Sequence, residues 1–409
     1  MAPRSAKYSQ MELPPPPPSS SQRIIFQMPV FESVEDVYMY RLGGHHPVDL
    51  GDIVGHRFRV IHKLGNGGFA LVWLARVLNQ DRYVALKILR ADASNNEIRI
   101  LEHLENAAGK IRITNLQETF KIRGPNGLHQ CLVLDFGGPS LRWVTLYCKR
   151  PPLPFLKAAA LKLAEGLAAV HEAGVCHGDL TDSNVLFEIT GLQDWSEEEL
   201  YRYLGPPKTA PLLLLDGKPA PAFAPMHVVD ALDYSCLDMG LLSNDILITD
   251  FGEAFFEDDA PNRVGTPASF SAPELLFGYQ PSRAVDLWAL GCLIFQIHTF
   301  QVLIPTIFGS EQEALAIAIE TIGALPEAWQ ESFSDKENPL EVENPGDTHR
   351  WFDDQIQRTR VVGSQIRKEL PEMSQDQHTA FLQLLQSALV FEPSRRLSAA
   401  EIAKSPWFV

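Results

Sequence analysis

Three side chains near the middle of the chain have the chemistry of metal-assisted phosphoryl transfer. The stretch "VCHGDLTDSNVLF" supplies Asp179 and, five residues later, Asn184. The stretch "LITDFGEAF" supplies Asp250. A carboxylate such as Asp179 can accept the proton of an attacking hydroxyl, and Asn184 and Asp250 offer the oxygen ligands that Mg²⁺ prefers. The alternative is an Asp/Asn-rich turn without chemistry.

The triplet Asp-Phe-Gly occurs twice, at Asp135–Gly137 and at Asp250–Gly252. In protein kinases the metal-binding triplet follows the catalytic loop in chain order. Asp135 precedes that loop and comes directly after the apolar stretch "CLVL", where a kinase has the hinge between its lobes. We therefore predict that Asp250 binds the metal and that the backbone of Asp135 and Gly137 binds adenine.

A glycine-rich turn lies between two predicted strands in "LGNGGFALVW". Glycines let backbone N–H groups close over phosphates without an intervening side chain. The predicted nucleotide-binding residues here are Leu64, Gly65, Asn66, Gly67, Gly68 and Val72. A plain hairpin turn is the alternative, and Ala70 stands where the kinase pattern has its third glycine.

The next predicted strand, "YVALKIL", contains Lys87, 15 residues after Val72. A lysine at this place holds the α- and β-phosphates in kinases and pairs with a carboxylate on the following helix. Glu97 shares a helix edge with Leu101 and Leu104, four and seven positions on, so we predict it as the partner, with Glu102 as the fallback. Ala85 and Leu186 are further predicted nucleotide contacts.

Two further motifs follow in kinase order. "SAPELL" contains the Ala-Pro-Glu sequence that closes an activation segment, and "DLWALGC" has helical spacing. Near the end of the chain, Arg396 is predicted to form a buried ion pair with Glu274.

Strand-like stretches begin at Phe58, and helical patterns follow from "PFLKAAALKLAEGLAAVHEAG" onward. This order indicates a small β-rich lobe before a larger α-rich lobe. We predict an α+β bilobal fold with an N-lobe at 36–136 and a C-lobe at 137–409. Residues 190–244 interrupt the pattern, with a helix capped by Ser196 and then a Pro/Ala-rich linker, as an insert of the C-lobe. The Pro/Ser-rich residues 1–35 are predicted to be a disordered tail.

The chain resembles eukaryotic protein kinases over residues 36–409, and most of all the SR-protein-specific kinases. The carrying stretch is "YRLGGHHPVDLGD", from Tyr40 to Asp52, together with an insert after the catalytic loop that is short for that family. The resemblance implies a bilobal kinase that uses ATP with Mg²⁺ and transfers phosphate to serine of Arg/Ser-rich proteins. It assigns catalytic roles to Lys87, Glu97, Asp179 and Asn184.

The chain departs from the kinase pattern at three places. Gly178 replaces the arginine that usually pairs with a phosphate of the activation loop, and residues 253–265 contain no Ser, Thr or Tyr, so we expect activity without loop phosphorylation. Thr181, also counted with the catalytic residues, stands where a lysine usually meets the γ-phosphate, which predicts a lower rate. "GTPASFSAPE" carries one extra residue, so the pocket for the substrate residue is expected to differ.

Bulk composition limits the possible partners. The net charge of −16 disfavours nucleic-acid binding through a generally positive surface. The acidic stretches "FFEDDAPN", "SEEEL" and "SFSDKENPLEVENPGD" permit Arg-rich substrates, although charge runs are often only solvated faces. We expect no membrane span. Five scattered free cysteines indicate a reducing compartment, and we expect the cytoplasm and/or the nucleus. We also expect a monomer that binds protein substrates.

Two other function classes stay open from the residues alone. One is a kinase-fold binding module with little activity, which the departures from the kinase pattern at Gly178, Thr181 and Ala70 suggest. "HGDLTDSN" resembles the catalytic loop of small-molecule phosphotransferases of the aminoglycoside or choline kind. The Ala-Pro-Glu motif and the predicted partner at Arg396 argue against the latter, because such enzymes build no peptide-binding segment.

Overall fold

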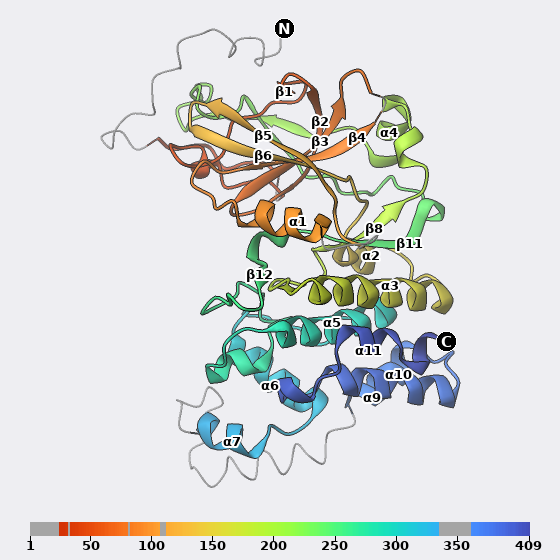
Figure 1. The fold of residues 1–409 in the computed structure, drawn as a ribbon. Coiled ribbons are helices and arrows are strands. Elements are labelled where there is room, and N and C mark those ends of the chain that lie inside the picture. Colours follow the sequence, from red (N-terminus) through yellow and green to blue (C-terminus); the bar gives the residue numbers. More distant parts are fainter. Residues whose placement is uncertain (1–23, 32, 81, 107–111, 335–360) are drawn as a thin grey trace. The chain divides into compact units, whose positions relative to one another are not determined.

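The computed structural model describes residues 24–31, 33–80, 82–106, 112–334 and 361–409. Within them the chain divides into two compact units. The smaller unit contains the described parts of residues 1–105, 114–138 and 189–242, and the larger contains those of 106–113, 139–188 and 243–409. The predicted order of a β-rich part followed by a mainly helical part is confirmed by the order of strands and helices (Figure 1).

The smaller unit is built on an antiparallel six-stranded sheet in the order β1-β2-β3-β4-β6-β5. Its strands are rich in Val, Leu, Ile and aromatic residues, which suit a pleated, buried surface. They are β1 (Ile53–Val54), β2 (Phe58–Asn66), β3 (Ala70–Val77), β4 (Tyr83–Leu89), β5 (Leu116–Gly124) and β6 (Gly127–Leu134), with helix α1 (Asn96–Asn106) between β4 and β5.

The pairing register shows which side chains share a face of this sheet. Val72 of β3 stands opposite Lys87 of β4, and Ala85 of β4 stands opposite Leu134 of β6. Because alternate residues of a strand point to opposite faces, these four side chains share one face. All seven residues of β4 are nevertheless buried, so the other face must be covered as well.

Two segments far apart in the sequence cover that other face. Its core combines strand residues such as Leu71, Trp73 and Leu86 with side chains from outside the sheet. Those side chains are Phe26, Val37, Tyr40 and Val48 from the N-terminal segment and Leu212, Phe223, Ala224, Val228 and Val229 from the insert.

The insert therefore packs with the smaller unit, whereas the sequence predicts that it belongs to the C-lobe. Its predicted helix is present as α4 (Glu197–Leu204), with a capping box between Ser196 and Glu199. The predicted Pro/Ala-rich linker instead contains a hairpin of β9 (Thr209–Pro211) and β10 (His227–Val229). Its apolar side chains are buried against the sheet, which a linker prediction from Pro content missed.

The predicted tail also differs within the described residues. Residues 1–23 and 32 lie outside them. Phe26 forms a β-bridge with Leu214 of the insert and is buried, and Glu35 forms a buried ion pair with Lys63 of β2. Residues before position 35 therefore pack with the smaller unit, because this segment brings apolar residues and a carboxylate to the sheet.

The larger unit is mainly helical. Its helices are α2 (Leu141–Tyr147), α3 (Leu153–Glu172), α5 (Arg283–Thr299), α6 (Glu311–Ile322), α7 (Glu327–Ser334), α9 (Val361–Glu369), α10 (Gln375–Ala388) and α11 (Ala399–Ala403). Two short strand pairs accompany them, β7 (Val175–Cys176) with β12 (Phe255–Phe256) and β8 (Val185–Ile189) with β11 (Leu242–Ile248). Apart from Arg283, every residue of α5 is buried, so this helix forms the centre of the unit.

Among the described residues, no helix is long and apolar enough to cross a membrane.

Candidate functional site

The predicted site residues divide between the two units. In the smaller unit, the glycine-rich turn joins β2 to β3, with Gly65 paired to Val72. Gly67 donates its N–H to Ala70 O at 3.0 Å, which closes the turn. A Cβ added at Gly65 or Gly68 would meet no atom within 4 Å, so packing does not require these glycines. Open space above a bare backbone is what a phosphate needs for close approach.

Lys87 and Glu97 form the predicted ion pair. Lys87 Nζ lies 2.8 Å from Glu97 Oε1 and 2.7 Å from Oε2. Both residues are buried, whereas the fallback partner Glu102 is exposed. The short connection between β4 and α1 is sufficient to bring the carboxylate of the first helical turn to the lysine. The sequence prediction of this pair is confirmed.

The predicted hinge follows β6 directly. Asp135 donates its N–H to Asn115 O at 3.3 Å, and its carboxylate accepts a hydrogen bond from Gln117 Nε2 at 2.7 Å. These bonds fix Asp135 in the smaller unit. The Asp135 N–H is therefore committed to the protein, which leaves the Asp135 carbonyl and the Gly137 N–H as the predicted adenine contacts.

In the larger unit, Asp286 of α5 organises the loop that holds Asp179. Its carboxylate accepts hydrogen bonds from the N–H groups of His177 at 2.7 Å and Gly178 at 2.9 Å. It also lies 2.9 Å from His171 Nε2. Burial alone would raise the pKa of Asp286, but these donors hold it below the usual value. Sequence reasoning noted the "DLWALGC" motif without assigning this role to its aspartate.

Asp179, Asn184 and Asp250 are brought together as predicted. Asn184 Nδ2 donates to Asp179 O at 2.8 Å and to Asp179 Oδ2 at 3.1 Å, so the Asn184 Oδ1 is the oxygen that can ligate a cation. Asp179 Oδ1 is buried without a hydrogen-bond partner among the described residues. Burial and the charge of Asp250 raise the pKa of Asp179 to about 7.

The backbone of Asp250 is in the left-handed region, at φ 63° and ψ 71°. Non-glycine residues adopt this conformation at a cost, and such strain concentrates at functional sites. The next residue, Phe251, is fully buried and its ring centroid lies 4.8 Å from that of His177. His177 Nε2 in turn lies 3.0 Å from Thr249 O. Packing of Phe251 thus fixes the strained aspartate beside the catalytic loop.

A divalent cation fits this set of donors. The Asp250 carboxylate and the Asn184 amide oxygen are hard ligands, and a cation held by them would also offset the charge of the buried Asp179 carboxylate. No group of three or more His, Cys, Asp or Glu side chains that could hold a metal occurs in the described part of the chain.

The departures from the kinase pattern have distinct structural settings. Gly178 has φ +73°, and a Cβ there would lie 2.7 Å from Glu253 O, so this position favours glycine on steric grounds. Thr266 Oγ1 donates to Gly178 O at 2.6 Å. Thr181 is buried, and its carbonyl accepts the Asn184 N–H at 3.1 Å. The predicted contact Leu186 forms a β-bridge with Ser140.

The predicted pair of Glu274 and Arg396 is confirmed as a bidentate ion pair. Arg396 Nη1 and Nη2 donate to the two carboxylate oxygens of Glu274, each at 2.7 Å, and both side chains are buried. Arg396 also donates to three backbone carbonyls, those of Ala284, Val390 and Phe391. The Ala-Pro-Glu end of the activation segment is thereby fixed to the core of the larger unit.

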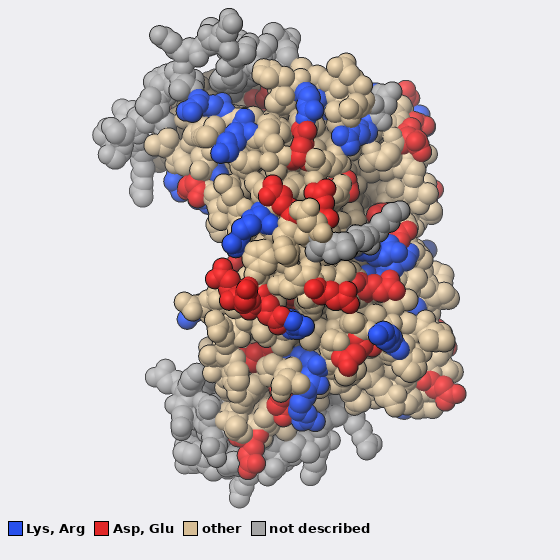
Figure 2. Space-filling model, in the orientation of Figure 1, with Lys and Arg blue, Asp and Glu red and all other residues tan. Residues whose placement is uncertain are grey.

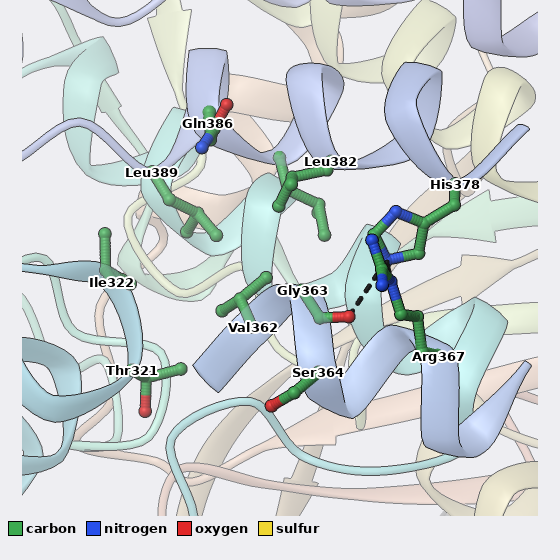
Figure 3. A pocket seen from close by; sticks show the side chains of 11 residues that line it. Thr321, Ile322, Val362, Gly363, Ser364, Arg367, His378, Leu382, Gln386 and Leu389 are labelled. Carbon is green, nitrogen blue, oxygen red and sulfur yellow. Dashed lines mark hydrogen bonds between the residues drawn. The ribbon is translucent and has the colours of Figure 1, made fainter. Parts of the chain in front are cut away.

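A separate cavity of about 580 Å³ lies in the larger unit between α6, α9 and α10 (Figure 3). Its wall combines apolar side chains such as Leu382 with Arg367 and His378, and the Gly363 carbonyl lies 2.9 Å from His378 Nε2. None of the predicted site residues lines it. It is therefore distinct from the phosphotransfer residues.

The acidic stretches named in the sequence are only partly described. Glu257 pairs with Arg283, while Asp258 and Asp259 are exposed. The stretch "SEEEL" belongs to the smaller unit, and residues 335–347 of the third stretch lie outside the described residues. On the face drawn in Figure 2, Lys and Arg are interspersed with Asp and Glu.

Comparison with known proteins agrees with this geometry. The family model described as protein kinase domain matches residues 58–194 and 239–408. The chain belongs to the protein kinase domain family. Residues 195–238, which separate the two matched ranges, fall within the insert. The crystal structure of another kinase domain has a TM-score of 0.60 at 19% identity and covers 89% of this chain and 99% of its own, which supports the bilobal kinase fold.

Curated relatives of this kinase include serine/threonine protein kinases. A serine/threonine protein kinase of Aspergillus fumigatus is 29% identical over 403 residues, covering 94% of this chain and 94% of its own. The serine/threonine-protein kinase SRPK of Physarum polycephalum is 26% identical over 407 residues, covering 92% and 91%. The human SRSF protein kinase 3 is 32% identical over 167 residues, covering 38% and 30%. The chain is thus a serine/threonine protein kinase that is similar to the SR-protein kinases, in a family that uses ATP and a divalent metal.

Proposed function

We propose that this kinase transfers the γ-phosphoryl group of ATP to serine hydroxyls of Arg/Ser-rich proteins, with Mg²⁺ as the divalent metal. The observation that carries the proposal is that Asp179, Asn184 and Asp250 lie together in one unit, where one buried Asp179 oxygen has no hydrogen-bond partner within the described part of the chain. The second support is the buried pair of Lys87 and Glu97 in the other unit. Together they form the set of groups that phosphoryl transfer needs.

The roles of the residues follow from their chemistry. Asp179 accepts the proton of the attacking hydroxyl, a task that a positioned carboxylate can perform. Lys87, oriented by Glu97, binds the α- and β-phosphates, and the glycine-rich turn covers the phosphates with backbone N–H groups. Asn184 and Asp250 would hold Mg²⁺, which neutralises phosphate charge when bound. Positioning and charge stabilisation supply most of the acceleration.

The substrate class rests on different grounds. The relatives include proteins named SRPK and SRSF protein kinase. The exposed Asp258 and Asp259 supply negative charge that suits arginine side chains. The net charge of −16 also favours basic protein substrates over nucleic acid. The proposal includes a monomeric kinase that acts in the cytoplasm and/or the nucleus.

The test is phosphate transfer from labelled ATP with Mg²⁺ to an Arg/Ser-repeat peptide and to a generic basic protein. Asp179→Asn is the matched control, because it preserves shape and removes the proton acceptor. We expect strong labelling of the repeat peptide by the wild type, none by the variant, and nearly equal nucleotide binding by both.

Three other outcomes would change the proposal. Labelling of the generic protein alone would keep the kinase activity and remove the Arg/Ser specificity. Nucleotide binding without transfer to either substrate would favour a kinase-fold binding module. Loss of nucleotide binding in Asp179→Asn would contradict the role given to that carboxylate.

A further inference from the structure

The glycine-rich turn is held by side chains on both sides of its tip. On the β2 side, Asn66 Nδ2 donates to Ser33 O in the N-terminal segment at 3.1 Å. On the β3 side, Arg90 Nη1 donates to Gly68 O at 2.8 Å. The Arg90 guanidinium carbon also lies 5.8 Å from the centroid of the Phe69 ring, and the Arg90 N–H donates to Phe69 O at 2.9 Å.

Arg90 is itself oriented by Asp92. Its Nε and Nη2 donate to Asp92 Oδ1 and Oδ2 at 2.9 and 2.8 Å, a bidentate geometry that fixes the plane of the guanidinium. The same contact holds the pKa of Asp92 below its usual value. Only 15% of the Arg90 side chain is exposed, so the guanidinium is confined between Asp92 and the turn.

The N-terminal segment also reaches Asp92. The N–H groups of Ala91 and Asp92 donate to Gly44 O at 3.1 Å and Gly43 O at 2.9 Å. A Cβ on Gly44 would lie 1.8 Å from Met39 O, so the turn within this segment requires glycine, and a Cβ on Gly43 would lie 3.3 Å from Asp92 Oδ2. Gly43 has φ +82°, which also favours glycine.

The segment that makes these contacts is anchored in the core of the smaller unit. Glu35 is buried in an ion pair with Lys63 of β2 and accepts a hydrogen bond from the Tyr40 hydroxyl. Lys63 Nζ also donates to Val229 O of the insert at 3.2 Å. Within residues 33–44, Glu35, Val37, Tyr40 and Gly44 are buried, so these side chains and backbone contacts fix the segment to the smaller unit.

We propose that residues 33–44 act as an intramolecular clamp that holds the glycine-rich turn ready for the phosphates of ATP. One route runs from Ser33 to Asn66, and the other runs from Gly43 and Gly44 through Asp92 and Arg90 to Gly68. Arg90 and Asp92 are positioning residues, since they act through the turn.

The physical reason is conformational entropy. A turn with Gly67 and Gly68 at its tip has wide backbone freedom, and ordering it on the nucleotide reduces affinity. Contacts that order it beforehand remove that cost from the binding step. The inference rests on the proposed function in one respect, namely that this turn binds ATP.

The test compares variants in the full-length protein. Arg90→Ala removes one route and Asn66→Ala removes the other, while Arg57→Ala is a matched control whose guanidinium pairs with Glu118 on the same sheet. The measured quantities are KM for ATP, kcat, the Kd of a fluorescent ATP analogue and Tm. We expect each clamp variant to raise KM and Kd about five- to tenfold, with Tm close to wild type, because each loses charged or polar hydrogen bonds outside the core.

Two double variants test whether the two routes are independent. Asp92→Asn combined with Arg90→Ala should have the effect of Arg90→Ala alone, because both residues belong to one route. Asn66→Ala combined with Arg90→Ala should multiply the two effects, because the routes are separate. Arg57→Ala should leave KM and Kd unchanged.

The outcomes separate this inference from the proposed function. Unchanged KM and Kd in the clamp variants of an active wild type would overturn the clamp, as would a rise that only follows a fall in Tm. A wild type that binds the analogue without transferring phosphate would refute the proposed function, and the Kd values would still test the clamp. A wild type that binds no nucleotide would overturn both.

Discussion

The ion pair of Glu274 and Arg396 offers the strongest test of the energetics of the larger unit. Arg396→Met removes two charge-assisted hydrogen bonds to Glu274 and three hydrogen bonds to backbone carbonyls. The Glu274 side chain, only 2% exposed, would be left as a buried carboxylate without its cation. Breaking one partner of such a pair costs about 3–5 kcal/mol. Globular domains are stable by about 5–15 kcal/mol, so this is a large fraction of the total.

The assay is urea unfolding followed by tryptophan fluorescence and circular dichroism. Trp288 is a local reporter, because the Arg396 guanidinium carbon lies 5.1 Å from its ring centroid. Arg395→Met is the control, since that side chain is 69% exposed and its pair with Glu392 should contribute about 0–1 kcal/mol.

A double variant distinguishes the charge from the volume. Glu274→Leu with Arg396→Met removes both charges and should cost clearly less than the two single substitutions added together. The reasoning fails if Arg396→Met costs less than about 1 kcal/mol, or if the double variant shows full additivity.

Three further predictions concern the smaller unit and the catalytic loop. Lys87→Met should abolish measurable transfer and weaken nucleotide binding, because Glu97 stays buried without this lysine. Comparison of kcat/KM and Tm with Glu97→Gln would show whether the two residues act as one unit. Burial lowers the pKa of His45 to about 4 and also lowers that of His129, so both side chains are neutral in the fold at pH 7. The free energy of unfolding should therefore fall as the pH drops below about 6.5, because the unfolded chain then binds protons that the folded chain does not. The urea midpoint against pH measures this, and a flat profile would contradict it. Gly178→Ala, at φ +73° and 2.7 Å from Glu253 O, should lower Tm and kcat, and an unchanged Tm would mean that the loop relaxes freely.

Several parts of the site were predictable because their chemistry demands a fixed order along the chain. Lys87 on a strand, Asp179 in a loop and Asp250 after it match the kinase pattern by residue type and spacing alone. The partner Glu97 followed from helix periodicity, and the buried pair with Arg396 followed from the motif order. Local rules also predicted α4 from its Ser196 cap.

The errors have a common physical cause. Proline and serine content suggested a tail up to residue 35 and a linker within the insert, but burial depends on which surfaces meet in space. The outer face of the sheet needs an apolar cover, and Phe26 and Val229 supply part of it from positions far apart in the sequence. Pairing of Arg90 and Asp92 with the glycine-rich turn has no motif in the sequence.

The sequence by itself therefore determined the chemistry, because catalysis fixes the types and order of a few polar residues. It also determined most strands and helices, whose patterns are local. Only the tertiary structure decided that the N-terminal segment and the insert belong to the smaller unit. Their positions depend on the burial of apolar surface and on pairs such as Glu35 with Lys63, contacts between distant segments that no local pattern encodes.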